Sequence, residues 1–406
     1  MNSGQTRPPA RPPARPPARP PARRPALPDT QLFLRPGIIE MNWGNPAPAL
    51  LPVDKVALAA AHALRDAGQA ALAYGAEQGP GRLLEPLASS LSRREGAAID
   101  PEQLFITGGI SQGLDLLCTL LSQRGDAVLV QAPVYHLALR IFADHGLVLA
   151  PVESDEQGLR VDAVAAALER LAAEGRRPRF LYTVPTWCNP TGVSLAAERR
   201  DALAALAGQH ELLILEDDVY RELWYDAPSP PPVQRLAPEH VIRLGSFSKI
   251  LAPGLRLGWL VAPPSLVRRC AGAGLLDSGG GVSHFTAHVV AGLFELGLLD
   301  EHIGLLRAAY RSRRDALLAA LEQHMPQGCR WQAPSGGFFV WLQLPGHLDS
   351  TALLKDAEAA GVSYVPGSRF FVGRGKTSKL RLAFSLLRED ELAEGARRLG
   401  RVIREA

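Results

Sequence analysis

One of the five lysines in this chain lies where a charged ammonium group is costly. Lys249 follows an apolar run that includes Leu244 and Phe247, and Ile250 comes directly after it. Partial removal from water lowers the pKa of an amine and favours its neutral, nucleophilic form. A neutral lysine can form a Schiff base with an aldehyde. The sequence therefore predicts carbonyl chemistry at Lys249.

The side chains around Lys249 are of the types that hold a phosphate. Ser246 and Ser248 offer hydroxyl groups, and Arg256 offers a planar cation. Pyridoxal 5'-phosphate (PLP) is a common cofactor that carries both an aldehyde and a phosphate. In the alternative interpretation, Lys249 extends from a buried strand to water and Arg256 makes a structural ion pair. This segment alone leaves both interpretations open.

Seven short β-rich runs alternate with helical patterns in the first two thirds of the chain. Strands separated by helices predict an α/β fold, with a mostly parallel seven-stranded sheet covered by helices on both faces. Such sheets bind ligands at the carboxyl ends of their strands. The runs are residues 104–107, 127–131, 147–152, 179–184, 212–215, 241–244 and 257–261.

Polar side chains follow five of these runs at the point where each run ends. Because parallel strands end at the same edge of a sheet, we expect these side chains to form one site. They are, in chain order, Ser111, Tyr135, Asn189, Asp217 with Tyr220, and Ser246 with Ser248 and Lys249.

The sequence predicts three regions. Residues 1–28 contain four Arg-Pro-Pro-Ala repeats, whose prolines exclude helix and sheet, so we expect a disordered basic tail. Residues 47–284 form the large domain. Residues 29–46 and 285–406, where long helical patterns surround two or three strand-like runs, form a smaller α+β domain.

Composition excludes several classes of protein. The net charge is +3, and most of the excess arginine lies in the tail, so the body does not resemble a nucleic-acid-binding domain. The four cysteines have neither disulfide nor metal-site spacing, which favours a reducing cytoplasm and no bound metal. No apolar run approaches the roughly 18 residues that a membrane span needs.

Four motifs follow one another in a specific order. They are Asn-Pro-Thr-Gly at 189–192, Glu-Asp-Asp-Val-Tyr at 216–220, Gly-Ser-Phe-Ser-Lys at 245–249 and Leu-Arg-Leu-Ala-Phe-Ser at 380–385. With these motifs the chain, from about residue 36 to its end, resembles the fold-type-I PLP-dependent aminotransferases of class I/II. Within them it is most similar to the branch of 2-aminoadipate and aromatic aminotransferases.

The resemblance assigns a role to the residues that would surround the PLP ring. Lys249 would hold the cofactor as an aldimine and carry protons during the reaction. Asp217 would pair with the pyridine nitrogen, and Asn189 and Tyr220 would donate hydrogen bonds to the phenolate oxygen. Tyr135 would stack on the ring, although a half-buried core tyrosine is an alternative for this position.

The resemblance also assigns the phosphate and substrate contacts. Backbone amides of Gly109, Ile110 and Ser111 would bind the phosphate at a helix N-terminus, together with Ser246, Ser248 and Arg256. Tyr74 would reach the phosphate of a neighbouring subunit, which implies a homodimer with shared active sites. Arg381 would grip the substrate α-carboxylate, with Asn189 and Gly44 beside it.

The implied activity is transfer of an amino group between an L-amino acid and a 2-oxo acid. The substrate side chain stays open between aromatic, aliphatic and 2-aminoadipate-like. A β-lyase, decarboxylase or oxidase reaction would fit the same motifs. A non-catalytic effector-sensing protein is less favoured, because a DNA-binding domain needs roughly 60–80 structured residues that the tail does not supply.

Overall fold

The structure is a computed structural model that describes residues 28–373, 375 and 377–406. The chain divides into two units, Met1–Leu34 and Arg35–Ala406, and everything below concerns the second. The predicted tail, apart from its last residue, lies outside the described residues.

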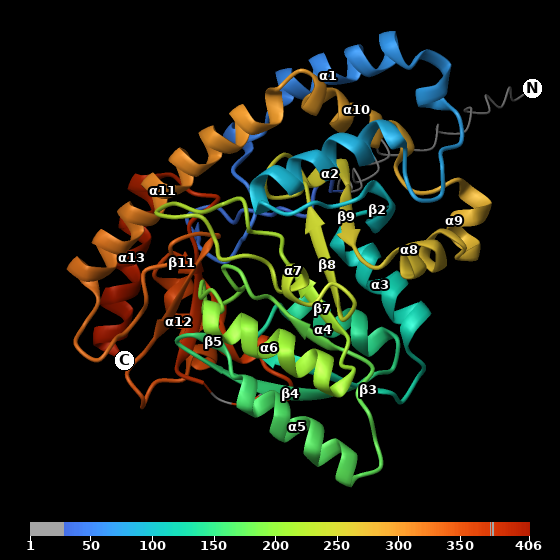
Figure 1. Ribbon diagram of the computed structural model, residues 1–406. Coiled ribbons are helices and arrows are strands. Elements are labelled where there is room, and N and C mark those ends of the chain that lie inside the picture. Colours follow the sequence, from blue (N-terminus) through green and yellow to red (C-terminus); the bar gives the residue numbers. More distant parts are fainter. Residues whose placement is uncertain (1–27, 374, 376) are drawn as a thin grey trace, which may run out of the picture. The chain divides into compact units, whose positions relative to one another are not determined.

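An eight-stranded sheet forms the centre of the second unit (Figure 1), in the order β2-β9-β8-β7-β6-β3-β4-β5. All seven predicted strands are present. The prediction of seven strands is wrong by one, because the two-residue strand β5 pairs antiparallel with β4 at the sheet edge and is too short to leave a pattern in the sequence. The strands are β2 (Leu104–Thr107), β3 (Ala127–Ala132), β4 (Val148–Asp155), β5 (Gly158–Leu159), β6 (Leu181–Thr183), β7 (Ile214–Asp217), β8 (Val241–Ser246) and β9 (Gly258–Val261).

Strand direction brings the ends of five strands to one edge. The pairs β3–β4, β3–β6, β6–β7 and β7–β8 are parallel. Strand β9 runs antiparallel to both β8 and β2, so β2 points the same way as β8. The carboxyl ends of β2, β3, β6, β7 and β8 therefore share the edge at which the sequence predicts the site.

Helices cover both faces of the sheet, as the strand pattern predicts. Val128 and Val130 pack into a core with α3, α4 and α8, whereas Ala127 and Leu129 face the other way and pack with α5, α6 and α7. This alternation follows from the two-residue period of a strand. The helices are α3 (Ile110–Leu121), α4 (His136–Asp144), α5 (Val161–Ala173), α6 (Ala197–His210), α7 (Val233–Leu236) and α8 (Pro264–Ala271).

A second group of helices packs together beside the β2 and β9 edge (Figure 1). Helix α10 contacts α1, α2 and α11. No helix in the described part of the chain is both long and apolar enough to cross a lipid bilayer. The group comprises α1 (Val53–Asp66), α2 (Gly81–Glu95), α10 (His284–Glu295) and α11 (Leu298–His324), whereas α9 (Gly274–Gly279) contacts α8.

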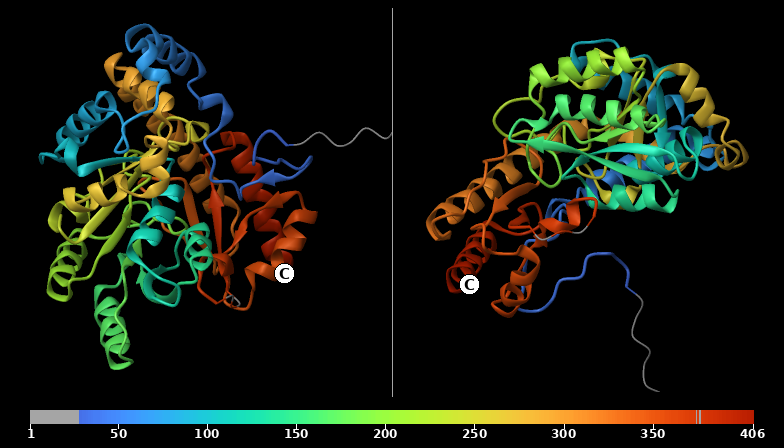
Figure 2. Two further views of the ribbon diagram at one scale, coloured as in Figure 1. Left: turned by 90° about the vertical axis from the view of Figure 1, so that its right-hand side faces the viewer. Right: turned by 90° about the horizontal axis from the view of Figure 1, so that it is seen from below.

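The C-terminal region forms a three-stranded antiparallel sheet, β10-β13-β12. The end of α11 packs against α13, and the short strand β1 near the start of the unit pairs with β11 (Figure 2). This pairing agrees with the expectation that the segment before Trp43 joins the smaller domain, and the domain boundaries themselves stay a prediction. The elements are β1 (Ile39–Glu40), β10 (Phe339–Gln343), α12 (Ser350–Ala359), β11 (Val362–Ser363), β12 (Val365–Pro366), β13 (Lys379–Ala383) and α13 (Glu389–Glu405).

Candidate active site

Lys249 lies in the turn after β8, between apolar side chains and other positive charges. Its Nζ donates a hydrogen bond to the carbonyl of Gly44 at 3.0 Å and lies 5.8 Å from the centre of the Phe338 ring. Burial, followed by the charges of Arg381 and Arg256, lowers the pKa of Lys249 to about 8. The amine is therefore neutral far more often than that of a solvated lysine.

Asp217 is the last residue of β7, and its carboxylate is buried. Its Oδ2 accepts a hydrogen bond from the Tyr182 hydroxyl at 2.7 Å. Its Oδ1 is also buried but has no hydrogen-bond partner among the described residues. Burial raises the pKa of Asp217 to about 6. A buried carboxylate oxygen without a partner fits a site that a ligand completes.

Arg381 lies on β13 and is buried, with no acidic partner among the residues that the structure describes. Its Nη1 donates to Oδ1 of Asn189 at 2.9 Å, and its Nη2 donates to the carbonyl of Asn42 at 2.6 Å. The guanidinium lies 4.3 Å from the centre of the Phe339 ring and 5.2 Å from that of Phe370. Burial lowers the pKa of Arg381 to about 10. All four contacts are neutral, so a bound anion would meet an uncompensated cation.

Gly44 brings the backbone close to both Lys249 and Arg381. A Cβ atom at position 44 would lie 2.6 Å from the Phe339 ring, which stacks on Arg381. The Gly44 carbonyl is also the acceptor for Lys249. A larger side chain would therefore displace the ring that positions the arginine.

Gly109 and Arg256 meet where β2 leads into α3. Gly109 has φ +87°, and a Cβ atom there would lie 2.7 Å from Nη2 of Arg256. That nitrogen donates to the carbonyl of Gly108 at 3.1 Å. Ile110 and Ser111 begin α3, where backbone N–H groups have no partner within the helix. The segment therefore presents N–H donors beside a guanidinium.

Ser246 and Ser248 lie in the turn that also carries Lys249. Ser246 ends β8 and is buried, and its Oγ accepts a hydrogen bond from the Ser248 N–H at 3.0 Å. The two serines are thus fixed relative to each other, three residues and one residue before Lys249.

Two tyrosines at strand ends lie in the same region. Tyr220 is buried with its ring edge-on to Phe338 and Phe339, at 5.4 and 5.7 Å between ring centres. Tyr135 is half-buried, and burial followed by the charge of Asp217 raises its pKa to about 12. Both phenols therefore stay protonated and can donate hydrogen bonds at neutral pH.

Tyr74 is the predicted site residue that the single chain does not bring to the others. Its side chain is 87% exposed. Its backbone is nevertheless closely packed, because a Cβ atom on Gly75 would overlap the His284 ring and one on Gly280 would lie 2.6 Å from the Gly75 carbonyl. The phenol is thus held outward on a fixed segment.

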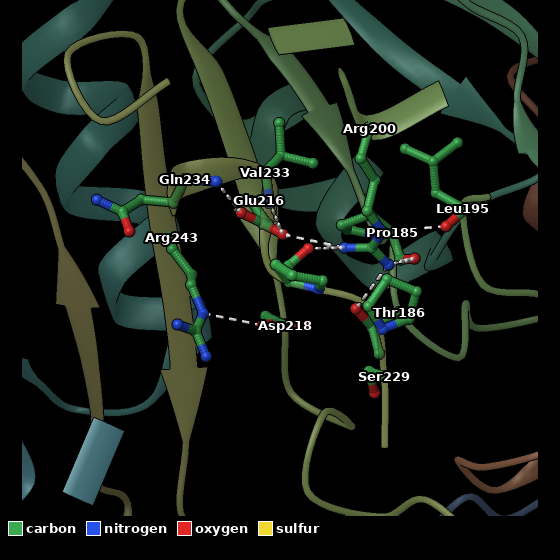
Figure 3. A network of polar contacts seen from close by, with 12 residues as sticks. Pro185, Thr186, Leu195, Arg200, Glu216, Asp218, Ser229, Val233, Gln234 and Arg243 are labelled. Atoms are coloured by element: carbon green, nitrogen blue, oxygen red, sulfur yellow. Dashed lines mark hydrogen bonds and ion pairs between the residues drawn. The ribbon is translucent and has the colours of Figure 1, made fainter. Parts of the chain in front are cut away.

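A buried network of charges surrounds Glu216 and Asp218, the residues on either side of Asp217 in the sequence (Figure 3). Glu216 accepts hydrogen bonds from the backbone N–H groups of Val233 and Gln234 at 3.0 and 2.8 Å. Arg200 lies 3.8 Å from Glu216 and donates to the Pro185 carbonyl at 2.6 Å. The network therefore connects the end of β7 to the segment that leads from β6 to Asn189.

Asp218 completes this network on the side of β8. Its carboxylate accepts hydrogen bonds from Arg243 at 2.8 Å and from Arg221. Although burial acts in the opposite direction, these two arginines lower the pKa of Asp218 to about 2. Two arginines thus hold Asp218 in its charged form, although its Oδ1, like that of Asp217, has no hydrogen-bond partner among the described residues.

Sequence reasoning missed four residues of this region. Tyr182 contacts Asp217, Phe339 and Phe370 stack on Arg381, and Asn42 contributes only its carbonyl. Tyr182 could have been found from the sequence. It lies in an apolar strand next to the strand that carries Asp217, and the hydroxyl of a buried tyrosine needs a polar partner. A backbone carbonyl gives no signal in the sequence.

The geometry can now be compared with known proteins. The family model for aminotransferase class I and II matches residues 38–399. The chain belongs to the class I and II aminotransferase family. It is 37% identical over 370 residues to an aromatic-amino-acid aminotransferase of Thermococcus litoralis, covering 91% of this chain and 88% of that one. It is 36% identical over 382 residues to a 2-aminoadipate transaminase of Thermus thermophilus, covering 92% of each chain.

A solved structure is similar in fold as well. The kynurenine aminotransferase of Pyrococcus horikoshii, crystallised in complex with PMP, superimposes with a TM-score of 0.86 at 36% identity, covering 91% of each chain. These comparisons confirm the predicted fold class, family and branch. They confirm that the protein is an aminotransferase, an enzyme of a PLP-dependent family.

The residues of this aminotransferase fit PLP. The free Oδ1 of Asp217 matches a protonated ring nitrogen, which is a donor. Arg256 lies close to the backbone of Gly108 and Gly109, beside the first N–H groups of α3. These donors are of the type that binds a phosphate. Lys249 supplies the amine. The protein thus offers a group of the right type to the ring nitrogen, to the phosphate and to the aldehyde of the cofactor.

The pKa of Lys249 predicts how covalent attachment of PLP depends on pH. Because that pKa is lowered to about 8, the neutral amine predominates above pH 8. About one amine in ten is neutral at pH 7, against roughly one in 2,500 for an ordinary lysine. We expect the attachment rate of PLP to the apoprotein to rise about tenfold per pH unit up to about pH 8 and then to level off, as followed by stopped-flow absorbance.

Two controls accompany this measurement. Lys249→Ala should show no attachment that borohydride can trap. A rate that continues to rise to pH 10, as for lysine free in solution, would show that the amine is not desolvated.

Proposed function

We propose that this aminotransferase transfers the amino group of an aromatic L-amino acid to a 2-oxo acid. The observation that carries the proposal is Arg381, a buried guanidinium stacked between Phe339 and Phe370 whose hydrogen-bond partners are neutral. Such a group is a receptor for a carboxylate. The aromatic rings around it favour an aromatic substrate side chain.

We infer the cofactor contacts from the family resemblance together with the positions of these residues. Asp217 would hold the ring nitrogen, Asn189 and Tyr220 the phenolate oxygen, and Tyr135 the ring face. Ser246, Ser248, Arg256 and the N–H groups of residues 109–111 would hold the phosphate. When bound, PLP supplies the electron sink that accepts the electron pair left at the Cα of the amino acid.

The protein's own groups then carry the reaction. Arg381 holds the α-carboxylate and so restricts rotation of the amino acid, with Asn189 and Gly44 completing this end of the site. The Lys249 amine, whose pKa is lowered to about 8, would take the Cα proton of the amino acid and pass it to the aldehyde-derived carbon of the cofactor, and would carry a proton in the opposite direction when the 2-oxo acid accepts the amino group. Asp217, as a carboxylate, stabilises positive charge at the far end of the ring.

Replacing Arg381 tests the proposal directly. Arg381→Lys keeps the charge but loses the planar pair of donors, and a hydrogen bond between charged groups contributes about 1.5–3 kcal/mol. We expect kcat/KM for tyrosine to fall about 10- to 150-fold relative to kcat/KM for tyramine, which lacks the carboxylate. Steady-state assays of the 2-oxo acid or aldehyde formed give the ratio.

The exposed Arg397→Lys is the matched control and should leave the ratio unchanged. Equal losses for tyrosine and tyramine would show that Arg381 does not bind the carboxylate. Release of ammonia or CO2 in place of a 2-oxo acid would support the β-lyase, oxidase or decarboxylase alternatives.

A 2-aminoadipate-like substrate is the second candidate, and Arg369 supports it. Arg369 is exposed, has no ion-pair partner within the described residues, and directly precedes Phe370, which stacks on Arg381. Burial, followed by the charges of Arg381, Arg369 and Arg140, lowers the pKa of His136 to about 4, so both Arg369 and Arg381 act on the same buried ring. A carboxylate at the far end of a substrate would meet this second cation.

Arg369→Ala separates the two candidates. An exposed ion pair contributes about 0.2–1 kcal/mol, so kcat/KM for 2-aminoadipate should fall about two- to fivefold if Arg369 binds the distal carboxylate. The value for tyrosine should not change. Parallel assays with both substrates give the comparison, and an unchanged value for 2-aminoadipate would remove the support for the second candidate.

We also propose a homodimer with shared active sites. Leu72 and Leu275 are 70% and 80% exposed, and they lie on segments that adjoin Tyr74. Exposed apolar side chains on packed backbone favour burial by a second copy of the chain. Tyr74 of one copy would reach the phosphate beside Arg256 of the other copy.

A cytoplasmic location is supported by four cysteines that are all free.

A mixing experiment tests the shared site. Tyr74→Phe should weaken PLP binding at least about tenfold, because a hydrogen bond to a charged group is lost. Lys249→Ala should abolish covalent attachment. If sites are shared, a heterodimer of the two variants contains one site with both Lys249 and Tyr74, so mixing should restore tight attachment at up to half of the sites. The absence of any rescue, with heterodimers verified by mass spectrometry, would contradict sharing.

A further inference from the structure

We propose that Tyr182 is a positioning residue for the reaction. Its phenol donates a hydrogen bond to Oδ2 of Asp217, which leaves Oδ1 as the acceptor for the ring nitrogen of the cofactor and stabilises the charged carboxylate. The inference rests on the proposed role of Asp217 toward PLP.

The register of the sheet explains why these two residues meet. Tyr182 on β6 pairs with Leu215 on β7, and Asp217 is two residues further along β7 on the same face. A tyrosine side chain is long enough to span this diagonal. Tyr182 is fully buried, and the Phe142 ring packs edge-on against it at 5.2 Å between ring centres. Its hydroxyl therefore has little freedom to leave Asp217.

The surroundings of Asp217 favour its protonated form, so the hydrogen bond from the Tyr182 hydroxyl matters for keeping it charged. Burial raises the pKa of Asp217 to about 6, Asp218 acts in the same direction, and Tyr182 and Lys249 act against it. Without the phenol, Oδ2 would be a second buried oxygen without its donor, and the carboxyl group would hold a proton more readily. The proton shared with the ring nitrogen would then reside on Asp217, and the ring would lose the positive charge that makes it an electron sink.

Tyr182 as a simple core residue is the competing explanation. A core tyrosine needs a partner for its hydroxyl, and any buried carbonyl would serve. Tyr364 is such a case, since it is equally buried and donates to the Ser350 carbonyl at 2.7 Å. Tyr364→Phe is therefore a matched control that removes a buried hydroxyl away from Asp217.

The test compares Tyr182→Phe with Tyr364→Phe in the holoenzyme. The first readout is the 15N NMR signal of PLP labelled at the ring nitrogen, which reports whether that nitrogen carries a proton. We expect a protonated nitrogen in the wild type and in Tyr364→Phe, and a shift toward the unprotonated form in Tyr182→Phe. We also expect kcat to fall about tenfold in Tyr182→Phe, with little change in KM for the amino acid, because Arg381 is untouched.

The outcomes separate this inference from the proposed function. A Tyr182→Phe enzyme with the wild-type nitrogen signal and kcat would make Tyr182 a core residue only, with the proposed function intact. A wild-type protein that binds no PLP, or binds it with an unprotonated nitrogen, would overturn the proposed role of Asp217 itself.

If Tyr182→Phe does not fold, 3-fluorotyrosine at position 182 provides a second test. It keeps the shape and the hydroxyl but is a stronger donor. Because a stronger donor makes the Asp217 carboxylate less basic, we expect the ring nitrogen to keep the shared proton at neutral pH at least as fully as in the wild type, and a signal shifted toward the unprotonated form would overturn the inference.

Discussion

The site depends on a buried cation that the protein leaves without an anion. Burying an arginine is costly unless its charge is paired, and breaking a buried pair typically costs about 3–5 kcal/mol. Here the guanidinium of Arg381 is supported by an amide oxygen, a backbone carbonyl and two aromatic rings, none of which carries a charge. The folded protein therefore holds a position for a carboxylate, and after burial the positive charge of Arg381 helps to lower the pKa of Lys249.

Strand β7 separates the Asp217 carboxylate from the arginines that pair with its sequence neighbours. Side chains alternate along the strand, so Glu216 and Asp218 point to a network of arginines while Asp217 points to the site. The charged residues of the network hold the strand end and the segment before Asn189 in place. The chemistry of Asp217 can then be tuned by Tyr182 without loosening its backbone.

The sequence predicted the parts of this arrangement that depend on residue type and strand period. Lys249 stood out by its apolar surroundings and Asp217 and Asn189 by their strand-end positions, whereas Arg381 came from the family resemblance; all seven main strands were placed. The missing parts depend on contacts across the fold. Nothing in the sequence tells that Phe370 reaches Arg381 across the β12–β13 pair, or that Asn42 contributes a carbonyl. Strand β5 was missed because two residues cannot show a period.

The half reaction in a single turnover tests the central claim most directly. Purified holoenzyme would be mixed with one equivalent of an aromatic L-amino acid and no 2-oxo acid, while the visible absorption of the cofactor and the product are recorded. We predict that the absorption band bleaches and that one 2-oxo acid is released per active site, with the amino group retained by the enzyme. Release of ammonia in the same amount, or no bleaching with any amino acid, would contradict it.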